Sequence, residues 1–157
     1  KDAVSRNMKF IADSMLGRLA KWLRILGYDT VYFKSGSDSE LVFESIRQGR
    51  IILTGDRNIS RNVPLRIIFV KSDCYTEQLM QIIKELGLKP EQNNFFKRCS
   101  VCNCLLNNIS REKIKRLVPE YVYETQTEFS NCPECGRIYW RGTHTDRIFE
   151  LLKRICV

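Results

Sequence analysis

Two Cys-x-x-Cys pairs constrain the fold of this chain more than any other feature. They are Cys99-Ser-Val-Cys102 and Cys132-Pro-Glu-Cys135, the second followed directly by glycine. Four thiolates in two such pairs form a closed tetrahedral site, which predicts Zn²⁺ bound by all four cysteines. A rubredoxin-like iron site uses similar pairs and stays open as the alternative. Because four protein ligands leave no position for water, we expect a structural role and no chemistry.

The remaining cysteines point to a reducing compartment. The count of seven is odd, and metal-type pairs argue against a disulfide framework. We expect Cys74, Cys104 and Cys156 to be bystanders, with a fifth ligand as the alternative for Cys104. No apolar run approaches the roughly 18 to 20 residues that span a bilayer, and no signal peptide is recognisable. The sequence predicts a cytoplasmic protein without a membrane partner. Residues 1–7 are either a remnant before a natural start at Met8 or the end of a longer protein.

Short apolar runs alternate with amphipathic stretches ahead of the cysteines. The run Ser37-Asp38-Ser39-Glu40 has the form of a capping box, and Gly27 and Gly49 are placed to end helices. The expected strands are residues 9–12, 30–33, 51–54 and 65–70, and the expected helices are residues 15–26, about 37–48 and 75–86. This alternation predicts an α/β fold with a parallel sheet covered by helices on both faces.

The periodicity fails in residues 87–96, which contain proline and asparagine and are interpreted as a linker. We therefore expect two domains, an α/β domain over residues 8–93 and a zinc ribbon with a C-terminal helix over residues 94–157. Within the ribbon, residues 110–117 are expected to form a short basic helix.

One aspartate follows each expected strand: Asp13, Asp38, Asp56 and Asp73. Each alone is typical of a turn or a helix N-terminus. The carboxyl ends of parallel strands share one edge, however, and carboxylates gathered there would repel one another without a cation such as Mg²⁺ or Mn²⁺. Such a site favours phosphodiester hydrolysis. No nucleophile arrangement competes, since the single histidine lies in the cysteine-bearing part, and no phosphate-binding loop is present.

The basic residues favour a polyanionic partner. Lys and Arg total 26 against 18 acids, a formal charge of +8. Arg18, Lys21 and Arg24 recur every three residues on the first helix, where they form either a solvated face or a phosphate-binding row. The residues assigned to RNA, expected to be single-stranded, are these three with Arg57, Arg137, Trp140 and Arg141. The alternative for the aromatic side chains near Arg137 is packing of the ribbon core.

Four sequence blocks carry a family resemblance. They are FIADSMLGRLAKWLRILGYDT, RIILTGD, FFKRCSVCN and FSNCPECGRIYWRGTH. In order and spacing they resemble the Mut-seven C-terminal RNase domain family, a PIN-like nuclease fold with an added zinc ribbon, and the resemblance runs from Met8 to about Ile155. It implies RNase activity dependent on Mg²⁺ or Mn²⁺ and acidic ligands at Asp13, Asp38 and Asp56. Many PIN-like relatives have a further acid where this chain has Asn58, so Asp73 is the candidate fourth ligand.

Two other functions are alternatives. A non-catalytic RNA-binding or interaction module would use the aspartates as caps and the ribbon for affinity. An aspartyl-phosphate phosphatase is disfavoured, because Ser14 and Met15 follow Asp13 without a second carboxylate in the same turn.

Overall fold

The computed structural model describes residues 7–59 and 65–155. The chain divides into two compact units, Lys1–Asn103 and Cys104–Val157. This division falls later than the expected boundary after residue 93, so the first cysteine pair belongs to the first unit. The sequence interpretations of residues 1–6 and of Cys156 lie outside the described residues.

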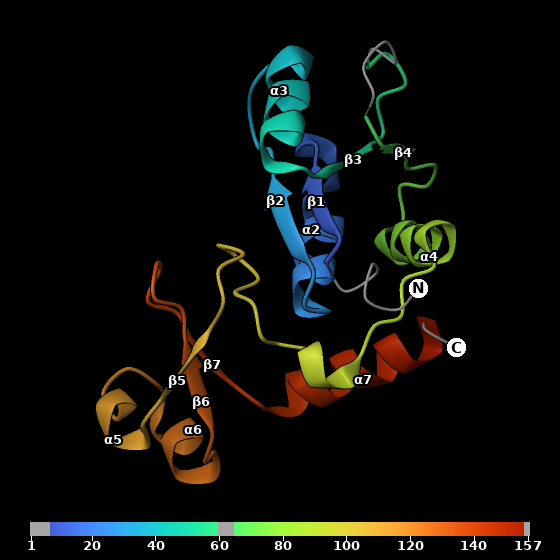
Figure 1. Cartoon of the computed structure of the whole chain (residues 1–157). Helices are drawn as coiled ribbons and strands as arrows, with labels where there is room; N and C mark the ends of the chain where they lie inside the picture. The colour runs from blue at the N-terminus through green and yellow to red at the C-terminus, as the bar shows by residue number, and fades with distance from the viewer. Residues whose placement is uncertain (1–6, 60–64, 156–157) are drawn as a thin grey trace. The chain divides into compact units, whose positions relative to one another are not determined.

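The first unit is built on a four-stranded parallel sheet (Figure 1). Its strands are β1 (Lys9–Ala12), β2 (Asp29–Tyr32), β3 (Ile51–Thr54) and β4 (Ile67–Phe69), arranged in the order β2-β1-β3-β4. Each neighbouring pair is parallel. The predicted α/β class is therefore confirmed. The edge strand β4 is shorter than the expected 65–70 run.

Helices cover both faces of this sheet. In β1, Phe10, Ile11 and Ala12 are all fully buried, and successive side chains of a strand point to opposite faces. Ile11 and Ile52 pack in one cluster with Leu41 of α3 (Asp38–Gln48). The helices α2 (Gly17–Ile25) and α4 (Tyr75–Leu86) contact each other, and α2 contacts β1 and β2. Continuous burial on both faces explains why β1 and β3 are apolar runs without alternation.

The helix ends follow from local chemistry. The Ser37 hydroxyl accepts from the Glu40 N–H, and the Glu40 carboxylate accepts from the Ser37 N–H, completing the predicted capping box. Gly49 ends α3 in the left-handed conformation at φ 63°, which glycine adopts without penalty. The first expected helix is divided into a 3₁₀ turn, η1 (Ser14–Leu16), and α2.

The segment expected as a linker is attached to the first unit. It contains the 3₁₀ turn η2 (Gln92–Asn94), and beyond it the Phe96 N–H donates to the Ile25 carbonyl oxygen at 2.9 Å. A side chain at Gly27 would place its Cβ 2.5 Å from the Asn94 carbonyl oxygen. Close backbone approach therefore requires glycine at this position.

The second unit contains a three-stranded antiparallel sheet in the order β5-β6-β7. Ile114, Val122 and Phe129 form its core. The expected basic helix over 110–117 is shorter, forming α5 only over Arg111–Ile114. The other elements are β5 (Asn107–Ile109), α6 (Glu120–Thr125), β6 (Phe129–Asn131), β7 (Ile138–Trp140) and α7 (Thr143–Ile155).

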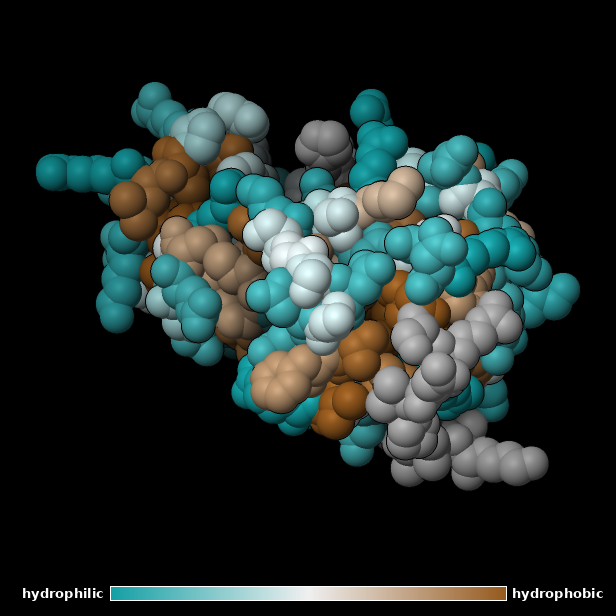
Figure 2. Space-filling model, turned by 90° about the horizontal axis from the view of Figure 1, so that it is seen from above, coloured by the Kyte–Doolittle hydropathy of each residue, from teal (hydrophilic) through white to brown (hydrophobic). Residues whose placement is uncertain are grey.

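The surface drawn in Figure 2 is covered mainly by hydrophilic residues, with hydrophobic ones in patches interrupted by polar side chains. Among the described residues, no helix has the length and apolar character required to cross a membrane.

Candidate acidic edge and four-cysteine centre

The strand order places a topological switch point between β1 and β3. From β1 the chain goes to β2 on one side, and it then returns to add β3 on the other side. In open parallel sheets, ligands bind at the carboxyl ends of the strands where the order reverses in this way. Asp13 directly follows β1, and Asp56 follows β3 after one intervening residue. The topology therefore sets these two carboxylates at the position where a site is expected.

Asp13 is buried, with only 9% of its surface exposed. One carboxylate oxygen accepts from the Met15 N–H at 3.0 Å, which makes Asp13 the cap of η1. The other oxygen accepts from the Thr54 hydroxyl and from the Gly55 N–H at 3.1 Å. Asp13 is thus fixed by donors from η1 and from the end of β3. A cap alone accounts for the first bond, and the bonds to the end of β3 go beyond it.

Thr54 links the two carboxylate-bearing loops. Its fully buried hydroxyl donates to Asp13 and accepts from the Asp56 N–H at 3.0 Å. The Asp56 Oδ1 in turn accepts from the Asn58 N–H at 2.8 Å. Sequence reasoning missed Thr54, although a hydroxyl residue ending an otherwise apolar strand immediately before Gly55 is a usable signal.

The other two acids stand apart. Asp38 is the first residue of α3 and is exposed, and Asp73 is exposed in the bend before α4. Among residues 7–59 and 65–155, the four cysteines alone form a group of three or more potential ligands close enough to share an ion. The fold thus brings Asp13 and Asp56 to neighbouring strand ends but does not gather the predicted carboxylates around one point.

The basic row on α2 is shorter than expected. Arg18 and Lys21 are exposed, whereas Arg24 is buried and its guanidinium donates to three backbone carbonyl oxygens. The prediction that Arg24 belongs to a phosphate-binding row is therefore wrong, because its guanidinium is buried and bonded to the backbone. The Arg18 guanidinium lies 5.0 Å from the centre of the Tyr75 ring, which stacks on Trp22 at 5.5 Å. Arg57, beside Asp56, is exposed.

In the second unit, the predicted RNA-binding residues have mixed surroundings. Arg137 is exposed, and Trp140 packs against the core cluster of Ile114, Val122 and Phe129. The Arg141 guanidinium lies 4.8 Å from the ring centre of Phe149. Trp140 therefore contributes to the core of this unit, which agrees with the alternative that the aromatic side chains near Arg137 pack the ribbon core.

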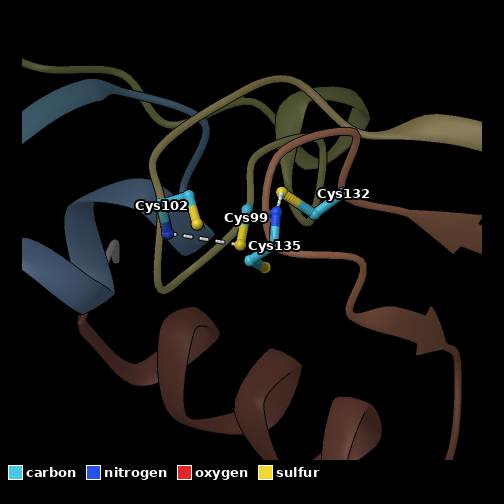
Figure 3. Close-up of side chains that lie close together, drawn as sticks. All are labelled: Cys99, Cys102, Cys132 and Cys135. Atoms are coloured by element: carbon cyan, nitrogen blue, oxygen red, sulfur yellow. Dashed lines mark hydrogen bonds between the residues drawn. The ribbon is translucent and has the colours of Figure 1, made fainter.

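The Sγ atoms of Cys99, Cys102, Cys132 and Cys135 all lie within 4.8 Å of one another (Figure 3). Tetrahedral zinc holds its sulfur ligands at about 2.3 Å, which separates them by roughly 3.8 Å. Four thiols at this spacing fit zinc, whose preferred ligands include thiolate sulfur.

The two cysteine pairs have the same backbone geometry. The Cys102 N–H donates to Cys99 Sγ at 3.3 Å, and the Cys135 N–H donates to Cys132 Sγ at 3.4 Å. The residue after each pair is left-handed, Asn103 at φ 70° and Gly136 at φ 73°. Such N–H groups stabilise a thiolate, the form that binds metal.

Cys104 is closer to this centre than a bystander would be. Its Sγ lies 2.9 Å from that of Cys132. Burial raises the pKa of the Cys132 thiol, but hydrogen bonds from Cys104 and from the backbone N–H groups of Cys135 and Glu134 lower it to about 6. A thiol that is ionised near neutral pH is prepared for metal binding.

A parallel sheet with a switch-point aspartate pair, accompanied by a four-cysteine cluster that could hold a metal, defines a two-unit α/β protein of the kind that the sequence blocks predicted. A family model described as "Mut7-C RNAse domain" matches residues 8–152, and the chain belongs to this family. It is also similar to the human protein "Exonuclease mut-7 homolog", with 30% identity over 124 residues. That alignment covers 73% of this chain and 14% of the human protein. No solved structure matches. The relationship supports a nuclease-type function acting on nucleic acid.

Proposed function

We propose that the chain is a ribonuclease that depends on Mg²⁺ or Mn²⁺ and cuts single-stranded RNA at the carboxyl edge of its parallel sheet. The observation that carries this proposal is the Thr54 bridge between the Asp13 and Asp56 loops at the switch point, in a chain of an RNase domain family. The human relative is described as an exonuclease. The chain covers 14% of that protein, so the exonuclease description applies to the human protein.

Asp13 and Asp56 would hold the ion, with Asp38 as the third ligand and Asp73 as the fourth. Asp13 is suited to this because three donors fix its carboxylate at the end of β1. A hard divalent cation bound there supplies a more acidic water and stabilises charge on phosphoryl oxygens. Asn58 has no carboxylate and is exposed, so Asp73 takes the position of fourth candidate.

The exposed cations would position the substrate. Arg18, Lys21 and Arg57 follow or flank the strand ends that bear Asp13 and Asp56, and each can bind a backbone phosphate. Arg137 and Arg141 are the candidates for RNA contacts in the second unit. These contacts carry no base information, which fits binding along the backbone of a single strand.

We also propose that Cys99, Cys102, Cys132 and Cys135 hold a structural Zn²⁺. The support is the sulfur spacing and the matching backbone N–H bonds of the two pairs. Thiols held for metal binding suit a reducing compartment such as the cytoplasm.

The ribonuclease proposal is tested by cleavage of labelled single-stranded RNA in the presence of Mn²⁺. We expect Asp13→Asn and Asp56→Asn each to reduce cleavage by at least about a hundredfold, which corresponds to roughly 2.7 kcal/mol of transition-state stabilisation. Asp146→Asn is the matched control, because Asp146 is an exposed aspartate in the first turn of α7. Equal cleavage by all four chains would show that the activity is not at this edge.

A second candidate is a non-catalytic RNA-binding module. The favouring observation is that Asp13 caps η1 while the four carboxylates are not gathered around one point. This function predicts RNA binding without metal that survives Asp13→Asn but weakens in Arg137→Ala, Trp140→Ala or Arg141→Ala. Unchanged binding in those three variants would count against it.

A further inference from the structure

The loop that carries the first cysteine pair is fastened to the α/β unit by side chains distant in sequence. Arg98, which precedes the pair, donates from Nε to the Gly27 carbonyl oxygen at 3.2 Å and from Nη1 to the Asn103 carbonyl oxygen at 2.9 Å. One guanidinium therefore ties the far end of the loop to its beginning and to Gly27. All of these residues belong to the first unit, Lys1–Asn103.

Arg24 holds the middle of the same loop. Its Nε donates to the Thr30 carbonyl oxygen at 2.8 Å, and its Nη1 donates to the carbonyl oxygens of Ser100 and Val101 at 3.1 and 2.9 Å. Ser100 and Val101 are the two residues between Cys99 and Cys102. Arg24 is only 7% exposed. Hydrogen bonds from a buried guanidinium are strong, and they fix the backbone that sets the cysteine spacing.

Asn103 connects the loop to the start of β2. Its Oδ1 accepts from the Thr30 N–H at 2.9 Å, and its Nδ2 donates to Asp29 Oδ1 at 2.7 Å. Asp29 Oδ1 also accepts from Arg50 Nη1 at 2.7 Å. Burial alone would raise the pKa of Asp29, but hydrogen bonds from Arg50 and Asn103 and the nearby charge of Arg98 hold it below its usual value. The acceptor is therefore a carboxylate at neutral pH.

The second cysteine pair offers an internal comparison. Gly136 occupies the position that Asn103 occupies in the first pair, with nearly the same φ, and the Gly136 and Asn103 N–H groups bond to Cys132 and Cys99 carbonyl oxygens at 3.0 and 2.9 Å. Glycine has no side chain with which to reach a strand. The ligating geometry thus does not require asparagine, and asparagine is less suited than glycine to a left-handed conformation. Its side-chain bonds to β2 are what distinguish the first pair.

We propose that Arg24 and Asn103 are positioning residues that couple metal binding at the four-cysteine centre to strand β2, so that zinc occupancy stabilises the sheet that bears Asp13. This rests on the proposal that the centre holds zinc. A loop held in its ligating form loses less conformational freedom when the ion binds, which raises affinity. By linkage, the ion then stabilises the strand that holds the loop.

Asn103→Gly tests the coupling, because it keeps the left-handed backbone while removing both bonds to β2. Zinc affinity of the full chain is measured by competition with a chromogenic chelator. We expect Asn103→Gly to bind zinc about tenfold more weakly, since losing hydrogen bonds of this kind is worth roughly 1.4 kcal/mol. Gly136→Asn is the matched control, because an added Cβ there meets no atom within 4 Å and asparagine already adopts this left-handed conformation at Asn103. Its zinc affinity should stay within about twofold of wild type.

The effect of zinc on thermal unfolding distinguishes coupling from a merely structural role of Asn103. If Asn103 only stabilised the fold, Asn103→Gly would lower the unfolding midpoint of the zinc-loaded chain and of the zinc-free chain by the same amount. Coupling predicts that the difference between the unfolding midpoints of the zinc-loaded and zinc-free chains, here called the gap, becomes smaller in Asn103→Gly. The same difference should stay unchanged in Gly136→Asn. An unchanged zinc affinity and an unchanged gap in Asn103→Gly would overturn the coupling alone.

Hydrogen exchange in the wild-type chain gives a readout that needs no variant. The Thr30 amide is the direct reporter, because its N–H is donated to Asn103. Removing zinc should speed exchange at Thr30 by tenfold or more, while the amides of β4 change little. Equal exchange at Thr30 with and without zinc would overturn the coupling, and a wild-type chain that bound no zinc would overturn both the metal assignment and the coupling.

Discussion

The four-cysteine centre and the acidic edge differ in how their members are brought together. Each cysteine pair lies within one tight loop, and the backbone of that loop sets the distance between its two Sγ atoms. Asp13, Asp38, Asp56 and Asp73 instead lie on four separate connections, and strand order alone relates them. The cysteines form one potential metal site, whereas the four carboxylates do not meet at one ion position among the described residues. Short-range spacing thus sets each half of the cysteine group, whereas strand order alone leaves the four carboxylates apart.

The largest expected effect concerns the four-cysteine centre. Cys99→Ser or Cys132→Ser should abolish tight zinc binding and destabilise the chain by several kcal/mol, because structural zinc contributes roughly 10 kcal/mol or more of apparent binding energy in small domains. Zinc content and thermal unfolding measure this.

Cys104→Ser is the control for those variants, since Cys104 contacts Cys132 without belonging to the four-sulfur group. It should retain one zinc per chain. Loss of zinc from Cys104→Ser with retention in Cys99→Ser would show that the ligand set is misassigned.

The next effect concerns the bridge at the acidic edge. Thr54→Val keeps the shape of a fully buried side chain but removes the hydroxyl that donates to Asp13 and accepts from Asp56. We expect a loss of about 1.5 to 3 kcal/mol in stability, the range for hydrogen bonds to charged groups, and at least about tenfold lower RNA cleavage. Thr54→Ser should restore both properties. A cleavage rate in Thr54→Val equal to wild type would break the link between the two aspartates.

A smaller, pH-dependent effect is expected at Asp29. The pKa of Asp29 is below its usual value in the folded chain. Its contribution to folding stability is therefore fully present above the pKa of the unfolded state and is lost as the pH falls through the pKa of the folded state. The stability difference between wild type and Asp29→Asn should therefore be largest near pH 7 and shrink below about pH 4. Chemical denaturation at several pH values measures it. A difference that stayed constant down to pH 2 would contradict the ion pair with Arg50.

The smallest effect on stability is expected at Asp38, which is either a helix-terminal residue or a metal ligand. Because Asp38 is exposed in the first turn of α3, Asp38→Asn should cost less than about 1 kcal/mol of stability, the range of a helix-dipole contribution. As a metal ligand it should still reduce Mn²⁺-dependent cleavage by tenfold or more. Stability and cleavage that both stay at wild-type levels would leave Asp38 a helix-terminal residue and remove it from the site.

Much of the fold could be predicted from the sequence, because local signals agree with the global arrangement. The strands at 9–12 and 51–54 and the helix at 75–86 match their predicted bounds, since uninterrupted apolar runs and a strong amphipathic pattern leave few alternatives. The capping box at Ser37 and Glu40 is equally local. The three strands of the second unit were not delineated, as they are three residues each and carry little periodicity.

The site was predicted only where its chemistry is local or follows from topology. Arg24 looked like one of three exposed cations, because helical spacing cannot tell which side chain a distant loop will cover. Ser100 and Val101 reach Arg24 across more than seventy positions of sequence. Thr54 was missed for a related reason, as its hydroxyl matters only once β1 and β3 are neighbours. Tertiary contacts of this kind give residues roles that their spacing does not reveal.

The most direct test of the metal-dependent nuclease site is anomalous diffraction from crystals of the wild-type chain soaked with Mn²⁺, with data also collected at the zinc edge. The zinc signal at Cys99, Cys102, Cys132 and Cys135 serves as the internal control. We expect a manganese peak about 2 Å from carboxylate oxygens of both Asp13 and Asp56, and we expect this peak to disappear in Asp13→Asn. Zinc at the cysteines with no manganese at these two aspartates would contradict the metal-dependent nuclease site.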